Sequence, residues 1–136
     1  MQNKYLQLND VSAYKTAFHL SNYACPVAKN ERIGVWDIVI KWDWFAKTHV
    51  GGQFVEAADS ISANIAEGFG RYHKKDKIKF YRYSQGSIKE SFDWNEKSKV
   101  RKFLNDEQYH HILGELQKLP KEINQQINLT NKKLTI

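Results

Sequence analysis

The sequence predicts an all-α protein, an antiparallel up-down four-helix bundle, and three observations support this fold class. Apolar residues recur at steps of three and four over long stretches, as they do on one face of a helix. Only two prolines and seven glycines interrupt the 136 residues, which favours long helices over a β fold with many turns. No segment shows the strict alternation that is typical of strands. A chain of this length suits one domain, expected over residues 1–136, with a core that needs neither disulfides nor a metal.

The first two helical segments are separated by a proline. The first is predicted from Asn9 or Asp10, either of which is a good N-cap, to about Tyr23. Pro26 then breaks the pattern, because proline lacks an amide proton and clashes with the preceding turn. A second segment follows from about Asn30 to Thr48, so we expect the first long helix of the bundle to be interrupted near Pro26.

The second segment is apolar on nearly all sides. Its two apolar stripes leave only a narrow polar strip between them, and such a helix must be covered on nearly all sides. One bundle core covers a single face. The three tryptophans Trp36, Trp42 and Trp44 therefore suggest a contact with another subunit, and full burial inside one domain is the alternative.

The next helix is predicted after a break at Gly51 and Gly52. Its apolar seam has spacings of 4, 3, 4 and 4 residues and consists of Phe54, Ala58, Ile61, Ile65 and Phe69. A polar line lies on the adjoining face, also at steps of three or four, and consists of Ser60, Asn64, Glu67 and Arg71.

The following helix is predicted from Lys74 to Asp76 onward and has a small, polar centre. Gly86, Ser84 and Ser87 would allow another backbone to approach closely. Glu90 would need a hydrogen-bonding partner if it were buried, and the polar line on the preceding helix could supply one. We therefore interpret both polar sets as architectural, fixing how two helices cross.

The last helix is predicted to start at Asn105, Asp106 and Glu107, because acidic residues in a first turn suit the helix dipole. Pro120 is expected to kink or divide it. The apolar stripe consists of Tyr109, Ile112, Leu113, Leu116 and Leu119, and Ile123, Ile127 and Leu134 carry the pattern on.

Positive charge is concentrated in one part of the chain. The net charge is +6, and residues 71–103 carry 11 Lys and Arg against 4 Asp and Glu, a net of +7. Residues 1–70 carry 6 against 7, and residues 104–136 carry 4 against 4. Such a concentration is typical of a footprint for polyanions, and a solvated helix face is the alternative.

Within this segment, residues 71–83 interleave cations with aromatic residues. That combination suits contact with phosphates and stacking on bases, and it makes RNA or another nucleic acid the expected partner. The candidate binding residues are Arg71, Lys74, Lys75, Lys77, Lys79 and Arg82.

Catalytic and metal sites are not indicated. A di-iron bundle needs Glu-x-x-His from two helices, and the chain has this motif only at Glu107 to His110. Adjacent His110 and His111 cannot both face one ligand and are expected to be partly exposed. We expect a non-enzymatic protein without metal, cofactor or small-molecule substrate.

Two other possible reactive motifs have simpler explanations. Cys25 has no histidine near it in sequence and cannot form an internal disulfide, which indicates a loose thiol in a reduced, cytoplasmic protein. Gly68 and Gly70 lack the spacing of a phosphate loop and are expected to end a helix or to admit a close crossing. No apolar run approaches the roughly 18 residues that span a bilayer, so no membrane partner is expected.

The stretch from Gln53 to Glu90 resembles a bacterial four-helix-bundle family first described from intervening sequences within 23S ribosomal RNA genes. The family pattern runs from a Gln-led helix through Ser-Ile-Pro-x-Asn-Ile-Ala-Glu-Gly-x-Gly-Arg to Gly-Ser-x-x-Glu. The matching positions here are Gln53, Ser60, Ile61, Asn64, Ile65, Ala66, Glu67, Gly68, Gly70, Arg71, Gly86, Ser87 and Glu90. Residues 36–40 and 119–124 are also similar to the family.

The resemblance implies an up-down bundle that assembles as a homopentamer, without attributed catalysis. It also implies kinship with the accessory protein of diversity-generating retroelements, whose basic pentamer works with nucleic acid and a reverse transcriptase. This chain departs from the pattern at Ser62, where the family often has proline, and at residues 24–34, which look like an 11-residue insertion. Pro26 in this insertion favours a bulged loop, and eleven residues, about three helical turns, would otherwise preserve the phase of the first helix.

Overall fold

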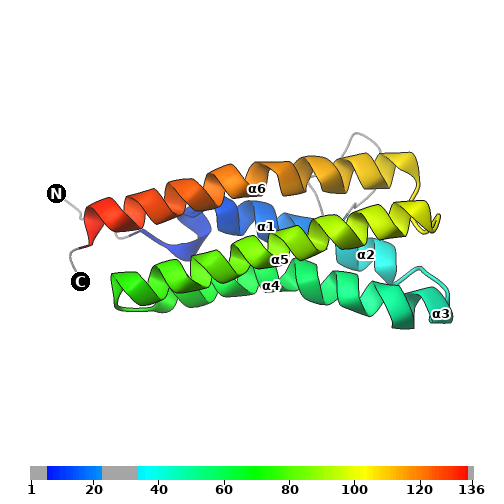
Figure 1. Ribbon diagram of the computed structural model, residues 1–136, viewed down its shortest axis with the longest axis horizontal. Coiled ribbons are helices and arrows are strands. Elements are labelled where there is room, and N and C mark those ends of the chain that lie inside the picture. The colour runs from blue at the N-terminus through cyan, green and yellow to red at the C-terminus, as the bar shows by residue number, and fades with distance from the viewer. Residues whose placement is uncertain (1–5, 23–33, 135–136) are drawn as a thin grey trace.

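Four helices lie along one another and enclose a common core: α1 (Ser12–Asn22), α4 (Gly52–Gly70), α5 (Lys74–Val100) and α6 (Asp106–Lys133) (Figure 1). This computed structural model describes residues 6–22 and 34–134. All regular elements in those two ranges are helical, which confirms the predicted all-α class. The expected interruption near Pro26, Cys25 and all of the 24–34 segment except Gly34 lie outside the described residues.

The long helices form a closed set of neighbours. Helix α4 packs against α1 and α5, and α6 also packs against α1 and α5. In Figure 1 the colours run in opposite directions along α4 and α5, and again along α5 and α6. The short helix α2 (Val35–Val39) lies against α1 and α4.

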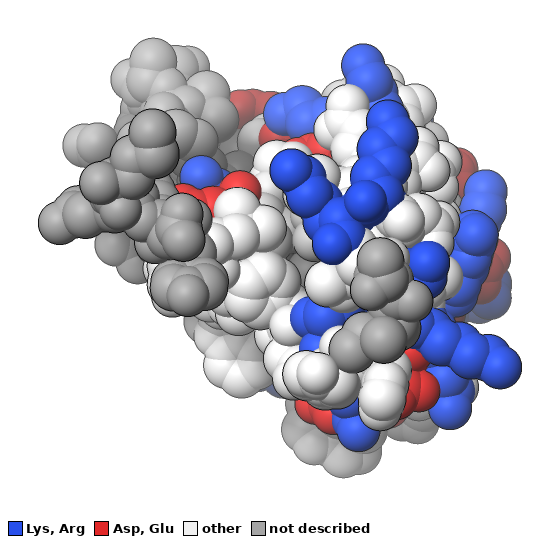
Figure 2. Space-filling model, turned by 90° about the vertical axis from the view of Figure 1, so that its left-hand side faces the viewer, with Lys and Arg blue, Asp and Glu red and all other residues white. Residues whose placement is uncertain are grey.

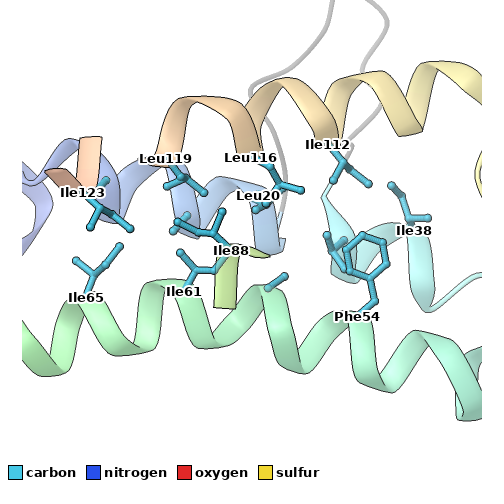
Figure 3. Packing of buried hydrophobic residues seen from close by; sticks show 14 of the residues in the cluster. Leu20, Ile38, Phe54, Ile61, Ile65, Ile88, Ile112, Leu116, Leu119 and Ile123 are labelled. Carbon is cyan, nitrogen blue, oxygen red and sulfur yellow. The ribbon is translucent and has the colours of Figure 1, made fainter. Parts of the chain in front are cut away.

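Aliphatic side chains fill the space between these helices. Figure 3 shows Ile65 beside Ile123, Ile61 beside Ile88, and Phe54 beside Ile112 and Ile38. Ile61, Ile112, Leu116 and Leu119 are completely buried. Each fully buried side chain of this kind contributes about 1.5–3 kcal/mol to folding, so this apolar seam is the main support of the fold.

The start of the first helix differs from the prediction. A 3₁₀ turn, Leu8–Asp10, precedes α1, and the Asp10 carboxylate accepts a hydrogen bond of 2.9 Å from the Gln7 amide instead of capping α1. Helix α1 therefore begins at Ser12. Ala13, Ala17 and Leu20 are buried as the predicted period requires.

The predicted helix from Asn30 to Thr48 is wrong in its extent. Helix α2 ends at Val39, and a new helix α3 (Trp44–Ala46) begins where the Asp43 carboxylate accepts a hydrogen bond of 2.9 Å from the Ala46 amide. A π-helical turn (Lys47–Gly51) then leads directly into α4.

The predicted break at Gly51 and Gly52 is also wrong, because both residues have helical backbone angles. A Cβ added to Gly51 would lie 2.4 Å from a methyl carbon of Val39. Gly51 is therefore needed for the close packing of α2 on this turn, and a glycine that looks like a helix breaker in the sequence lies inside a continuous helical run from Trp44 to Gly70.

Helix α5 turns a largely polar face to the core. Its buried residues are Tyr81, Ser84, Ile88, Ser91, Asn95 and Ser98, at steps of three and four. The helical period of the sequence predicts a core face of Ile78, Tyr81, Gln85, Ile88, Phe92 and Asn95. Tyr81, Ile88 and Asn95 are buried, and Ile78, Gln85 and Phe92 are half-buried. Four of the six buried residues are small or polar, Ser84, Ser91, Asn95 and Ser98, in line with the predicted small, polar centre of this helix.

Helix α6 is continuous through Pro120, which rules out a division there and leaves a kink as the expected effect of this proline. Asn105 caps it: the Gln108 amide donates to the Asn105 side chain over 2.8 Å, and the Asn105 amide donates to the Gln108 side chain over 3.0 Å. In the turn before it, Lys102 has a left-handed backbone with φ of 63°, and the Phe103 amide donates to the Ser98 carbonyl over 2.8 Å. These bonds close the C-terminus of α5 in the manner of a Schellman motif.

Candidate nucleic-acid interface

The turn between α4 and α5 brings the start of the basic segment against the end of α4. Helix α4 ends at Gly70 and α5 begins at Lys74. A Cβ on Gly68 would lie 2.9 Å from both the Lys77 carbonyl oxygen and a ring carbon of Tyr81. Gly68 is therefore required where the two helices come closest.

Arg71 is held at this turn by two contacts. Its guanidinium donates to the Glu67 carboxylate over 2.5 Å and lies 4.7 Å from the centre of the Phe80 ring. Both members of the ion pair are about half exposed. An exposed pair contributes little to stability, and the outward side of the guanidinium stays accessible to a ligand.

Lys77 is occupied within the protein. Its ammonium donates a hydrogen bond of 2.6 Å to the Phe69 carbonyl in the last turn of α4, and it lies 5.5 Å from the Phe69 ring. Burial lowers the pKa of Lys77 below its ordinary value. Of the six candidate binding residues, Lys77 is thus placed as a cap for α4 and is the least available for a phosphate.

The other cations of α5 point outward. Lys75, Lys79 and Arg82 are exposed, and Lys74 is half-buried. Lys79 lies 5.9 Å from the Tyr83 ring, and Arg82 donates to the Gln85 side chain over 3.2 Å. The residues Lys75, Lys79, Arg82 and Lys89 follow one another at steps of 4, 3 and 7, so they share one face of α5. We call these four residues the cationic stripe.

The fold brings further cations to the same end of the molecule. Lys132 and Lys133 close α6, and Figure 1 places this end of α6 beside the turn between α4 and α5. Figure 2 looks onto this end and shows Lys and Arg side chains over several parts of it, with fewer acidic ones. We define the basic end as Arg71, Lys74, Lys75, Lys79, Lys132 and Lys133. The sequence analysis missed the two α6 lysines, because only the packing brings them near residue 71.

The polar line on α4 does not bridge helices as expected. Ser60 donates to the Glu56 carbonyl over 2.7 Å, and Asn64 donates to the Ser60 carbonyl over 2.8 Å. Their hydrogen bonds therefore stay within α4. In the middle of the two helices, the bond from α5 to α4 comes instead from Ser84, which donates to the Ile61 carbonyl over 3.0 Å. It adds to the bond from Lys77 to the Phe69 carbonyl at the end of α4.

The corresponding expectations for α5 also need correction. Glu90 is exposed and accepts a hydrogen bond of 3.4 Å from the Trp94 indole. Ser87 is half-buried, and its carbonyl accepts a bond of 2.8 Å from Ser91. Nothing lies within 4 Å of a Cβ added to Gly86, so no backbone of the described chain approaches it closely. Ser87 and Glu90 lie outside the core face of α5, because that face is formed by the residues that follow each of them, Ile88 and Ser91.

The tryptophans lie towards the other end of the molecule. Trp36 is 51% exposed and Trp44 is 74% exposed, and Ile40 and Phe45 are exposed beside them in sequence. Trp42 is half-buried, with its ring 5.2 Å from that of Phe103. Trp42 thus has a partner within the chain. We define the aromatic end as Trp36, Ile40, Trp44 and Phe45.

The described residues contain no group of three or more His, Cys, Asp or Glu side chains placed to hold a metal ion. His110 is exposed, and its Nδ1 lies 2.8 Å from the Asp106 carbonyl, whereas His111 is half-buried. Across residues 6–22 and 34–134, none of the helices has both the length and the apolar character required to cross a membrane.

Two of the three comparisons with known proteins found a match, one to a solved structure and one to a family model. No curated protein sequence matches the chain. The fold is similar to a crystal structure from Bacteroides thetaiotaomicron, described as a protein of unknown function from the S23 ribosomal protein family. The TM-score is 0.67 at 16% identity, over 85% of this chain and 97% of the other. The sequence model of the 23S rRNA-intervening sequence proteins matches residues 10–125. The chain therefore belongs to the family of 23S rRNA-intervening sequence proteins.

Proposed function

We propose that this protein is a non-enzymatic, oligomeric helical-bundle protein that binds RNA or another nucleic acid through its basic segment, residues 71–103. The observation that supports the proposal is the basic end, where cations from the α4 to α5 turn, from α5 and from the end of α6 gather. Phosphates of a nucleic acid are the polyanion that such a surface suits best.

The contacts within the chain sort the candidate residues. Arg71, Lys75, Lys79 and Arg82 are exposed, and Lys132 and Lys133 extend the surface. Lys77 is assigned to the cap of α4 instead. The binding surface is therefore built from the basic end and the cationic stripe.

The finer architecture belongs to the same proposal. We infer that the unit is a single domain, an antiparallel four-helix bundle with its first helix interrupted, and that it assembles as a homopentamer. The aromatic end supports self-association, since exposed tryptophan and phenylalanine side chains are enriched in the cores of protein interfaces. Ring assembly would multiply the basic end five times and strengthen attraction of a polyanion.

Salt dependence tests the binding. The affinity for a fluorescein-labelled structured RNA should fall steeply between two salt concentrations. Replacing Lys75 and Lys79 by Glu should weaken binding and lower the slope of log affinity against log salt by about 1.4 to 1.8. Lys47→Glu, an exposed cation of the π-helical turn, is the matched control and should change neither. The proposal would be contradicted if the RNA affinity changed neither with the salt concentration nor on replacement of Lys75 and Lys79 by Glu.

A protein-interaction scaffold without nucleic acid is the second candidate, and the aromatic end favours it. Native mass with and without nuclease treatment separates the two functions. A purified oligomer that carries no nucleic acid and binds none would favour the scaffold. A native mass equal to that of one chain would rule out self-association for both candidate functions.

A further inference from the structure

The packing of the described chain does not explain Gly86. It lies in the middle of the 27-residue helix α5, is exposed, and would accept a Cβ without any contact within 4 Å. Glycine weakens a helix interior, because it loses more backbone freedom on folding than any other residue. A binding partner that occupies the space beside Gly86 would explain why a glycine stands there.

A groove of about 310 Å³ opens beside Gly86, between α5 and α6. Ile88 and Pro120 give it apolar walls, and Gln85 and Lys89 give it polar ones. The Gln85 amide is fixed on both sides: it accepts from Arg82 over 3.2 Å and donates to Asn124 over 3.0 Å. This volume is at the small end of the range for ligand sites, about 300–1,000 Å³, which suits one small planar group.

The groove lies within the cationic stripe. Gly86 follows Arg82 by four residues and precedes Lys89 by three, so it lies on the same exposed face as the stripe. A chain that follows the stripe therefore passes the mouth of the groove. Because the stripe is positively charged, the ligand chain that it complements is a polyanion.

We propose that the groove at Gly86 takes one unpaired base of a single-stranded nucleic acid whose phosphates lie along the cationic stripe. This inference rests on the proposed function and adds a preference for single strands to it. A duplex keeps its bases paired and stacked and cannot place one in the groove, whereas a single strand can turn a base outward. The apolar walls from Ile88 and Pro120 offer contact that does not depend on which base is present, so the site selects strandedness and not a base.

Filling the groove tests the proposal. Gly86→Leu, tested with a labelled 20-nucleotide RNA without secondary structure, should weaken binding about 10-fold, as expected when one apolar contact is no longer buried. Binding of the same RNA annealed to its complement should not change. Gly114→Leu is the matched control, because Gly114 also lies within a helix and has nothing within 4 Å of an added Cβ. It should change neither affinity.

Gly86→Ala and crosslinking keep the test independent of the folding of the leucine variant. The alanine variant should melt higher, because alanine favours a helix interior, and it should still bind the single strand. RNA that carries 4-thiouridine should crosslink to the peptides with Gly86 or Pro120.

Several outcomes would overturn the inference. Equal effects of Gly86→Leu and Gly114→Leu, or equal affinity of the wild-type protein for both RNA forms, would overturn it and leave the proposed function standing. A change in native mass of Gly86→Leu without loss of RNA affinity would assign the groove to a contact between copies. Failure of the wild-type protein to bind either RNA would overturn the proposed function as well.

Discussion

At the scale of single residues, chemically similar side chains in one basic segment have different surroundings. Lys75 is exposed, whereas Lys77, two positions along, is half-buried and caps α4 through the Phe69 carbonyl. This difference could not be predicted from the sequence, because the bond depends on the close approach of the helices at Gly68. Charge alone therefore does not identify a binding residue.

Substitution should separate these two roles. Lys77→Gln should lower the free energy of unfolding in urea by about 1.5 kcal/mol, because the Phe69 carbonyl loses a charged donor. Its effect on RNA affinity should be small. Lys75→Gln should do the reverse, weakening RNA binding with a free energy of unfolding close to that of the wild type. Equal stability of the two variants would contradict the assigned cap.

The buried Tyr81 should make the protein sensitive to alkali. Burial raises the pKa of Tyr81 above its ordinary value of 10.0. The folded state therefore keeps the hydroxyl proton at pH values where the unfolded state loses it. The stabilisation is complete below pH 10 and is lost as pH rises towards the folded pKa.

Urea denaturation at several pH values above 9 should show this loss, and Tyr81→Phe should make the alkaline decline shallower. Tyr83→Phe, a change at an exposed tyrosine, serves as the control. Lys77 acts in the opposite direction, because its lowered pKa adds stability as pH rises towards 10.5. Double replacement with Lys77→Gln separates the two contributions. An unaltered decline in Tyr81→Phe would show that this hydroxyl stays neutral or ionises equally in both states.

At the scale of elements, the sequence predicted the existence of helices better than their limits. The seam of α4 and the stripe of α6 follow a strong apolar period, and Ile61, Ile65, Leu116 and Ile123 are buried as predicted. The error at Gly51 has a physical cause: the close packing of Val39 requires glycine inside a helical run, so tertiary packing overrides its local preference. At Pro120 the helix continues through a residue that ordinarily breaks it. Lys132 and Lys133 join the basic end only through packing, so no local pattern could assign them to it.

The turn between α5 and α6 offers a test at this scale. Lys102 adopts a left-handed backbone, which costs a residue other than glycine about 1–2 kcal/mol. Lys102→Gly should therefore raise the free energy of unfolding by about 1 kcal/mol and the melting temperature by roughly 3 °C. Lys102→Ala keeps the unfavourable backbone and should give no such gain. A lower melting temperature for the glycine variant would show that the lysine side chain stabilises the turn.

At the scale of the whole molecule, the two kinds of exposed surface lie apart. The basic end gathers cations at the α4 to α5 turn, and α2 and α3, which carry most of the aromatic end, lie towards the opposite end of the molecule (Figure 1). This separation allows self-association and binding of nucleic acid to be tested independently.

One tryptophan variant and one tyrosine variant test whether the aromatic end is the site of self-association. Trp44→Ser should lower the mass of the assembly in sedimentation velocity, because it removes a side chain that is 74% exposed at the aromatic end. Tyr72→Ser changes an equally exposed side chain at the turn between α4 and α5 and should leave the mass unchanged. If both variants keep the mass of the wild type, the aromatic end is not the contact.

The unbroken helical run from Trp44 to Gly70 has a mechanical consequence. Twenty-seven residues make a rod of about 40 Å, and the π-helical turn joins its parts without a hinge of irregular chain. A partner that binds this helical run at Trp44 therefore also fixes the orientation of its other end, next to Arg71. In an assembly joined at the aromatic ends, the basic ends would lie at a fixed distance from the centre. The spacing between the basic ends of neighbouring copies would then be set by a rigid helix and not by a flexible linker.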